Sequence, residues 1–415
     1  MKMTSLLALT GLALASATST VQAQSSVTLY GLMDTGIETI SNVGAAGFRV
    51  NRVPSNTATI PSRAGFRGRE DLGGGLAAVF TLEMGIAPDT GASGQGGRLF
   101  GRQALVGLSG DWGAVTLGRQ YTMTFWSLLE SDIFGPSVYG LGALDAYIPN
   151  ARADNAIAYR GKFGDVSVGA TYSLGRDTVN AGPSPAGTNC AGENGADARA
   201  CREWSAMVKY DTKVWGAALA YDRLNGRTVT AATGPVFGGL DSADKSDTRV
   251  MLNGYANIGP VKVGGGVIRR NNEGSATIPK SNLLYVGAAY TLSPAVMFDG
   301  AIAKLDYKNG STSDATLVAL RSWYRFSKRT SVYAQVGRIR NGSASAVSVS
   351  SGAPGSNPAA GGSQTGAMAG ISHSFYTPRP AVVQSREERP DCSQKKATFR
   401  WLFQWPVNRT SFEIK

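Results

Sequence analysis

The chain has 415 residues, 53 of them glycine, and a formal net charge of +12 with one histidine, His373. One histidine leaves no His cluster for zinc and no Ser/His/Asp set, so we expect neither an enzyme nor a metal or other cofactor. The 41 Lys and Arg residues are spread over many segments, whereas a nucleic-acid binder more often gathers them on one face. We therefore expect no nucleic-acid partner.

The first 23 residues have the features of a secretory signal peptide. Lys2 gives a positive start, an apolar run follows over 6–15, and 21–23 (VQA) offers small residues for cleavage before Gln24. This run is too short to span a membrane, and no later stretch has 18 consecutive apolar residues. The mature chain is therefore expected to begin at Gln24, to leave the cytoplasm and to contain no membrane-spanning helix.

Alternation with a period of two recurs in segments of about ten residues, which is the pattern of membrane-barrel strands. The clearest examples are residues 27–34, 204–211, 249–256 and 261–268. Each has one face that lipid would accept and one face that is smaller, more polar or mixed. These segments predict β-strands with lipid on one side.

The expected connections are alternately short and long. Short turns are expected at 70–76, 110–113, 161–165, 211–214, 258–260, 292–294 and 327–330. Longer loops rich in Gly, Ser and Pro include 176–202, 225–246 and 341–362. Eight hairpins of about 44 residues over 24–375 give an all-β fold, a transmembrane 16-stranded antiparallel barrel with periplasmic turns and extracellular loops. Sixteen strands leave room for an aqueous channel.

One connection, residues 121–150, is unlike the others. It is rich in Gly and aromatic residues, and its only charges are Glu130, Asp132 and Asp145. Compact soluble domains usually connect their elements with about 4 to 6 residues. We expect this segment to fold into the barrel, pack on its wall and narrow the opening.

Four segments resemble the general diffusion porins of Gram-negative outer membranes, particularly the β-proteobacterial kind: 27–36 (VTLYGLMDTG), 62–83, 104–121 and 366–375 (GAMAGISHSF). The resemblance runs in order from about Gln24 to Phe375. It implies a trimer in the cell outer membrane, in contact with lipid and lipopolysaccharide, whose third extracellular loop folds inward as a constriction. It also implies that the barrel-assembly machinery recognises the final aromatic residue, Phe375.

The resemblance further implies that basic wall residues face acids on the inward loop. By motif, the bases are Arg63, Arg102 and Arg152, and the acids are Glu130 and Asp132, with Asp145 behind them. A base expected in the first strand is absent, because Leu32 occupies that inward position.

Strand parity gives further lumen residues. It places Arg67 and Arg69 on the face of Arg63. In the fourth strand it places Arg102 on the face of 104, 106 and 108, which we interpret as a wall patch covered by the inward loop.

Inward bases along the other strands outnumber inward acids. The bases are Lys209, Arg249, Lys262, Arg270, Arg321 and Arg325, and the acids are Asp34, Asp154, Asp211, Asp222 and Asp299. Bases opposite acids across a narrow aqueous slot orient polar solutes and discriminate by charge. We therefore expect passive diffusion of small hydrophilic solutes with a weak anion preference.

Two other functions stay open on the same fold. A substrate-selective channel would need a saturable site, such as an aromatic ladder made of Phe125, Trp126, Phe134 and Tyr139. A surface adhesin would act through its loops. A conductance that rises linearly with salt would favour the diffusion pore, and saturation by one solute would favour the selective channel.

Cys190 and Cys201 lie in one long loop of an exported protein, so a disulfide between them is expected and Cys392 would stay unpaired. Residues 376–415 do not show barrel alternation. They carry eight Lys and Arg against four Asp and Glu and include the apolar FRWLFQW. We interpret this basic C-terminal extension as a read-through or frame-shifted stop, with a periplasmic extension as the alternative.

Overall fold

The computed structural model describes residues 26–55, 57–177, 190–193, 195–230, 234–236, 238–351 and 355–376. The expected signal peptide, Cys392 and the extension beyond Tyr376 lie outside these ranges. Tyr376 itself belongs to the last strand, which therefore extends one residue beyond its expected end at Phe375.

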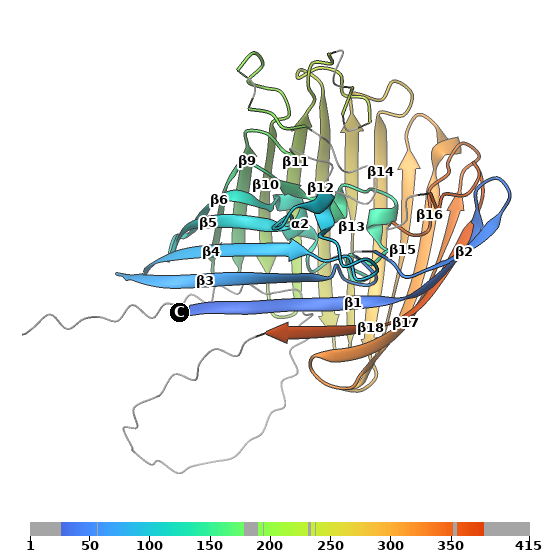
Figure 1. Ribbon diagram of the computed structural model, residues 1–415, viewed down its shortest axis with the longest axis horizontal. Helices are drawn as coiled ribbons and strands as arrows, with labels where there is room; N and C mark the ends of the chain where they lie inside the picture. Colours follow the sequence, from blue (N-terminus) through green and yellow to red (C-terminus); the bar gives the residue numbers. More distant parts are fainter. Residues whose placement is uncertain are drawn as a thin grey trace, which may run out of the picture.

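Sixteen antiparallel strands of the described chain form a closed barrel, as the sequence predicts (Figure 1). They are β1 (Ser26–Val43), β3 (Arg63–Gly73), β4 (Leu76–Gly85), β5 (Gln103–Gly110), β6 (Gly113–Tyr121), β8 (Ala156–Phe163), β9 (Val166–Ser173), β10 (Glu203–Asp211), β11 (Trp215–Asn225), β12 (Ser246–Ile258), β13 (Val261–Asn272), β14 (Lys280–Thr291), β15 (Val296–Tyr307), β16 (Ala315–Arg325), β17 (Thr330–Asn341) and β18 (Gln364–Tyr376). The pairing of β1 with β18 closes the ring, so no strand edge is left open.

Shorter elements lie in the connections between these strands. They are β2 (Phe48–Arg52), α1 (Gly94–Gly97), α2 (Met123–Leu128), η1 (Leu141–Ala143), η2 (Ile148–Asn150), β7 (Arg152–Ala153) and η3 (Ser311–Ser313). None of the helices in the described ranges is long and apolar enough to cross a membrane.

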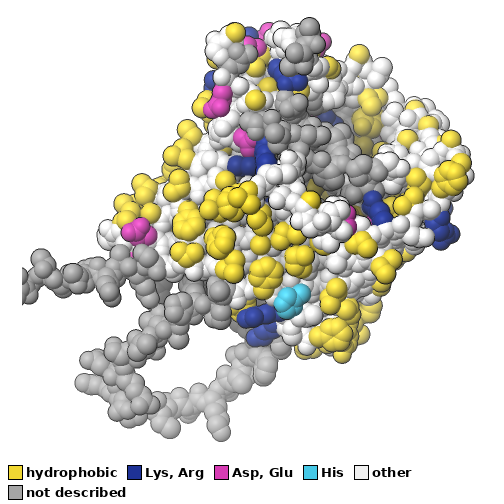
Figure 2. Space-filling model, in the orientation of Figure 1, with side chains coloured by type: hydrophobic (Ala, Val, Ile, Leu, Met, Phe, Trp, Pro, Cys, Tyr) yellow, Lys and Arg dark blue, Asp and Glu magenta, His cyan; other side chains and the backbone are white. Residues whose placement is uncertain are grey.

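The two faces of the wall differ as the alternation predicts. In β12, Val250 and Leu252 are 43% and 57% exposed, whereas Arg249 and Met251, which alternate with them, are 1% and 0% exposed. Successive side chains of a strand point to opposite faces, so one set meets lipid and the other the lumen. Figure 2 shows apolar side chains over much of the outer surface of the barrel.

The short connections lie where the sequence predicts them. Gly164 and Gly259, in the links between β8 and β9 and between β12 and β13, have φ angles of +60° and +58°. A side chain would have open space at both positions, so the left-handed backbone is what favours glycine there.

The face predicted for Arg102 is wrong. Val106 and Leu108 are 57% and 45% exposed and point outward, whereas Arg102 is 4% exposed and points inward. The reason is that β5 begins at Gln103, so Arg102 lies before the strand and the alternation does not extend to it.

Candidate functional site

The segment between β6 and β7, residues 122–151, contacts the inner faces of distant strands. In α2, Met123 N donates to Ser205 Oγ at 2.9 Å and Thr124 Oγ1 donates to Asp222 Oδ2 at 2.8 Å. Further along, the carbonyl oxygen of Phe134 accepts from Arg321 Nη2 at 2.9 Å. The segment is therefore attached to the inner faces of β10, β11 and β16 (Figure 1).

Apolar packing accompanies these polar contacts. Phe134 and Tyr139 are each 1% exposed. The ring of Tyr139 lies over Gly337 and Gly366, where an added Cβ would approach ring carbons to 2.8 Å and 2.7 Å. These glycines of β17 and β18 leave the space that the ring occupies.

Two of the three acids of this segment pair with wall bases. Asp145 accepts from Arg249 Nε at 2.8 Å and Nη2 at 3.1 Å, and Glu130 accepts from Lys262 Nζ at 2.7 Å. Burial acts to raise the pKa of Asp145, but the attraction of Arg249 outweighs it and holds the pKa below its usual value. Asp145 thus fastens the segment to β12.

Asp132 has a different environment. It accepts from Gly135 N at 3.1 Å and lies on the wall of the cavity described below. Burial is the main cause that raises its pKa to about 6. Asp132 is therefore the acid of the segment that can change charge near neutral pH.

The three bases expected at the constriction come together around Glu83 and Tyr121. Arg102 Nε lies 2.7 Å from Glu83 Oε1, and Arg63 Nε lies 3.7 Å from Glu83 Oε2. The hydroxyl of Tyr121 accepts from Arg102 Nη2 at 2.5 Å and from Arg152 Nη2 at 3.4 Å. Two guanidinium groups therefore lie against the Glu83 carboxylate, and the third, that of Arg152, joins the cluster through Tyr121.

Within the described ranges, Arg152 forms no ion pair with a carboxylate. Its Nε and Nη1 atoms are buried and have no hydrogen-bond partner in the described part of the chain. Burial is the largest cause that lowers its pKa, to about 10, so the group stays protonated at neutral pH. Its Cζ atom lies 4.8 Å from the centre of the Tyr121 ring, within the range of a cation–π contact.

Glu83 was not predicted as a site residue. Alternation along β4 places it on the inner face with Val79 and Thr81, so the sequence contained the signal.

A cavity of about 820 Å³ lies beside this cluster. Its basic lining residues are Arg63, Arg67, Arg69, Arg102, Arg152, Arg160 and Lys262, and its acidic ones are Glu83, Asp111 and Asp132. The lining extends from the short turns, at Gly75 and Asp111, to the arginine cluster. The cavity is therefore the half of the lumen that lies nearest the short turns. Its lining has more positive than negative groups.

The expected excess of inward bases on the other strands needs correction. Five of the six bases form ion pairs: Lys209 with Asp211, Arg249 with Asp145 and Asp247, Lys262 with Glu130, Arg270 with Asp247, and Arg321 with Asp299. These pairs are close to neutral. The positive excess comes instead from the cluster around Glu83 and from Arg160, which was not predicted.

Two other residues expected on the lumen face, Asp34 and Leu32, are buried against neighbouring parts of the chain. Asp34 is 1% exposed and accepts from Thr59 N at 3.0 Å and from Tyr333 OH at 2.9 Å. Leu32, on the same face of β1, is 2% exposed. Asp34 therefore holds the loop before β3 against the wall and does not contribute an open charge.

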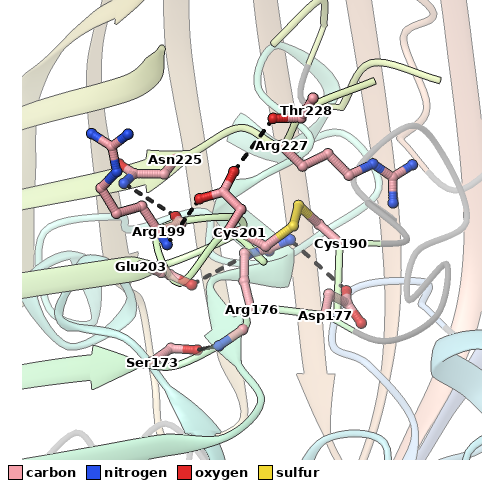
Figure 3. The surroundings of a disulfide bond; sticks show 12 residues. Ser173, Arg176, Asp177, Cys190, Arg199, Cys201, Glu203, Asn225, Arg227 and Thr228 are labelled. Atoms are coloured by element: carbon pink, nitrogen blue, oxygen red, sulfur yellow. Dashed lines mark hydrogen bonds and ion pairs between the residues drawn. A yellow bond between two sulfur atoms is a disulfide. The ribbon is translucent and has the colours of Figure 1, made fainter. Parts of the chain in front are cut away.

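Cys190 and Cys201 form a disulfide with an S–S distance of 1.97 Å (Figure 3). The carbonyl oxygen of Cys201 accepts from Arg176 N at 3.0 Å. The side chain of Arg176 reaches the other way, and its Nη2 donates to the carbonyl oxygen of Asn150 at 2.9 Å. Arg176 therefore links the disulfide to segment 122–151: its backbone binds Cys201, and its side chain binds Asn150 at the end of the segment.

The last strand ends near two residues singled out in the sequence. Phe375 covers Gly31 of β1, where an added Cβ would lie 2.2 Å from the Phe375 ring. His373 is exposed on the outer face, with Nδ1 2.8 Å from Thr330 Oγ1. Phe375 therefore packs on β1, and His373 lies on the outer face of the barrel.

The proposed aromatic ladder is not continuous. Phe125 and Trp126 line the cavity, whereas Phe134 and Tyr139 are buried in the packing between the segment and the wall. Only the first two rings are therefore available to a solute in this cavity.

Comparisons with known proteins agree with this architecture. Residues 8–344 match the Gram-negative porin family. The chain is 30% identical over 384 residues to outer membrane porin protein 32 of Delftia acidovorans, covering 88% of this chain and 99% of that one. It is 29% identical over 361 residues to an outer membrane porin protein of Bordetella pertussis, covering 77% of this chain and 90% of that one.

A solved structure, the anion-selective porin from Comamonas acidovorans, superposes with a TM-score of 0.67 at 28% identity and covers 85% of this chain and 100% of that one. Family match, sequence relatives and barrel architecture thus lead to one assignment. The chain belongs to the Gram-negative porins and is a channel-forming barrel of the outer membrane.

Proposed function

We propose that the protein is a general diffusion pore for small hydrophilic solutes and that it prefers anions. The observation that carries this proposal is the arginine cluster, in which Arg63 and Arg102 pair with the one carboxylate of Glu83 and Arg152 lies against Tyr121. Fixed positive charge in a narrow aqueous passage raises the local concentration of anions and repels cations. The similar structure whose title names an anion-selective porin supports the same preference.

The constriction is formed by segment 122–151 on one side and by the arginine cluster on the other. Asp145 and Glu130 serve as anchors, through Arg249 and Lys262, instead of facing the cluster as free charges. Asp132 is then the one acid of the segment that also borders the cavity. The electric field across the constriction therefore comes mainly from the arginine cluster.

The assembled pore is a homotrimer in contact with lipid and lipopolysaccharide, and the end of β18 at Phe375 is the signal for the barrel-assembly machinery. A solved structure with this fold is titled a trimer form, which supports the assembly. Mass photometry of the detergent-solubilised protein tests it, because a monomer mass would contradict a trimer.

The conductance of the purified protein in a planar bilayer tests the diffusion pore. We expect single-channel conductance to rise in proportion to KCl concentration once the lumen charges are screened. A conductance that saturates would indicate a substrate-selective channel with an ion-binding step. Absence of ion flow from correctly folded protein would contradict the pore and would leave the adhesin.

A further inference from the structure

Three aromatic rings, at the end of β6 and the start of segment 122–151, form a cluster. The ring centres of Tyr121 and Phe125 are 3.8 Å apart in a stacked arrangement, and those of Phe125 and Trp126 are 5.2 Å apart and nearly perpendicular. Tyr121 ends β6, and the other two residues belong to α2. All three border the cavity of about 820 Å³.

A guanidinium group lies at each end of this ring cluster. Arg152 Cζ is 4.8 Å from the centre of the Tyr121 ring, and Arg160 Cζ is 3.7 Å from the centre of the Trp126 ring. Arg160 reaches this position from the inner face of β8 and borders the same cavity. The rings are thus flanked by two positive charges.

Arg160 differs from the paired arginines of the lumen wall. Within the residues that the structure describes, its guanidinium forms neither an ion pair nor a hydrogen bond, whereas Arg249 and Arg270 both pair with Asp247. A guanidinium stacked on an indole keeps its N–H groups in the plane of the group, where they can donate to an anion. Arg160 therefore offers donors without an acceptor.

The cavity next to these groups also offers apolar surface. Leu129 and Ile133 belong to the same lining, together with the polar Thr116 and Gln120. Its volume lies within the range of about 300 to 1,000 Å³ that small-molecule sites occupy. The lining thus offers aromatic and apolar surface beside the unpaired guanidinium of Arg160. A simple inorganic anion would contact only the guanidinium, whereas an anion with an apolar part would contact both.

We propose that Phe125, Trp126 and Arg160 form a binding site for small aromatic carboxylates passing through the pore. The carboxylate accepts hydrogen bonds from Arg160, and the aromatic ring of the solute packs against Phe125 and Trp126. The inference rests on the proposed anion-preferring pore and names a class of anion that it passes. Binding is weak, because a solute that transits must also leave.

The experiment measures block of chloride current through the wild-type pore in a planar bilayer by benzoate, cyclohexanecarboxylate, acetate or benzyl alcohol. Benzoate is expected to block saturably, with half-block at roughly two- to tenfold lower concentration than cyclohexanecarboxylate, since aromatic pairing adds to burial. Acetate lacks the ring and benzyl alcohol lacks the charge, so both should block less than benzoate.

Variants locate the site. Arg160→Gln should raise the half-blocking benzoate concentration roughly tenfold or more, because a charged hydrogen-bond donor is lost. Trp126→Leu should raise it roughly two- to tenfold, and Trp126→Phe should keep most of the block. Matched controls on the outer face, Arg340→Gln and Trp204→Leu, should leave it unchanged.

The conservative variants Arg160→Lys and Trp126→Phe keep the test decisive should the larger changes prevent insertion. Equal block by benzoate and cyclohexanecarboxylate, or benzoate block that both Arg160→Lys and Arg160→Gln leave unchanged, would overturn the site while the pore stands. Cation preference of the wild-type channel without benzoate would instead contradict the proposed anion preference on which the site rests.

Discussion

Asp145→Asn tests whether segment 122–151 is held in place by its charged contacts. The Asp145 carboxylate accepts from Arg249 Nε at 2.8 Å and from Nη2 at 3.1 Å, and the two side chains are 10% and 2% exposed. Removing one partner of a buried ion pair costs about 3 to 5 kcal/mol. Arg249 keeps a second partner, Asp247 at 3.1 Å, so we expect about 2 kcal/mol for the substitution.

This cost falls on the segment and not on the barrel. The neighbouring Tyr147 keeps its hydroxyl 2.7 Å from both Glu203 and Asp222, so one anchor weakens while another stays. We expect greater open-channel noise, a moderate rise in mean conductance and faster proteolysis within 122–151. Single-channel recording and limited proteolysis measure these effects.

Asp306→Asn is the matched control, because Asp306 forms an exposed pair with Lys308 away from the segment. Wild-type noise, conductance and proteolysis in Asp145→Asn would refute the reasoning.

The strength of the Asp145–Arg249 anchor depends on pH with a definite sign. Because Arg249 holds the pKa of Asp145 below its usual value, the anchor persists above that range and weakens only as pH falls through the lowered pKa.

Three further outcomes are expected. Burial raises the pKa of Asp132 to about 6, so lowering the pH from about 7 to about 5 adds a proton there and removes a negative charge; reversal potentials should then show a stronger anion preference, and Asp132→Asn should abolish the change. Arg152→Gln should reduce the anion-to-cation permeability ratio roughly twofold, the effect of one charge in a wet passage, and an unchanged ratio would contradict its role. Replacing Cys190 and Cys201 by Ser should speed proteolysis of the loop between them while leaving ion preference unchanged, and a changed preference would show that the loop reaches the constriction.

The wall of the barrel could be predicted from the sequence because lipid and water impose a strict alternation on every strand. Val250 and Arg249 illustrate it, one exposed and the other buried. The same rule failed for Arg102, since alternation holds only inside a strand and β5 begins one residue later. Strand ends, where several site residues lie, are therefore the least predictable places.

Pairing across the lumen could not be predicted. Asp145 and Arg249 are 104 residues apart, and no periodicity links an irregular segment to a strand it touches. Counting inward bases therefore overestimated the free charge on β12, β13 and β16, whereas Arg160 and Glu83 were overlooked. The path of segment 122–151 also decides which of its rings border the cavity. Phe134, a member of the aromatic ladder that a selective channel would need, is buried.

The reversal potential of the wild-type channel across a KCl gradient tests the central claim most directly. The cluster of Arg63, Arg102 and Arg152, which contains one carboxylate, that of Glu83, predicts a zero-current potential of the sign set by chloride. A potential near zero, or one of the sign set by potassium, would contradict the account.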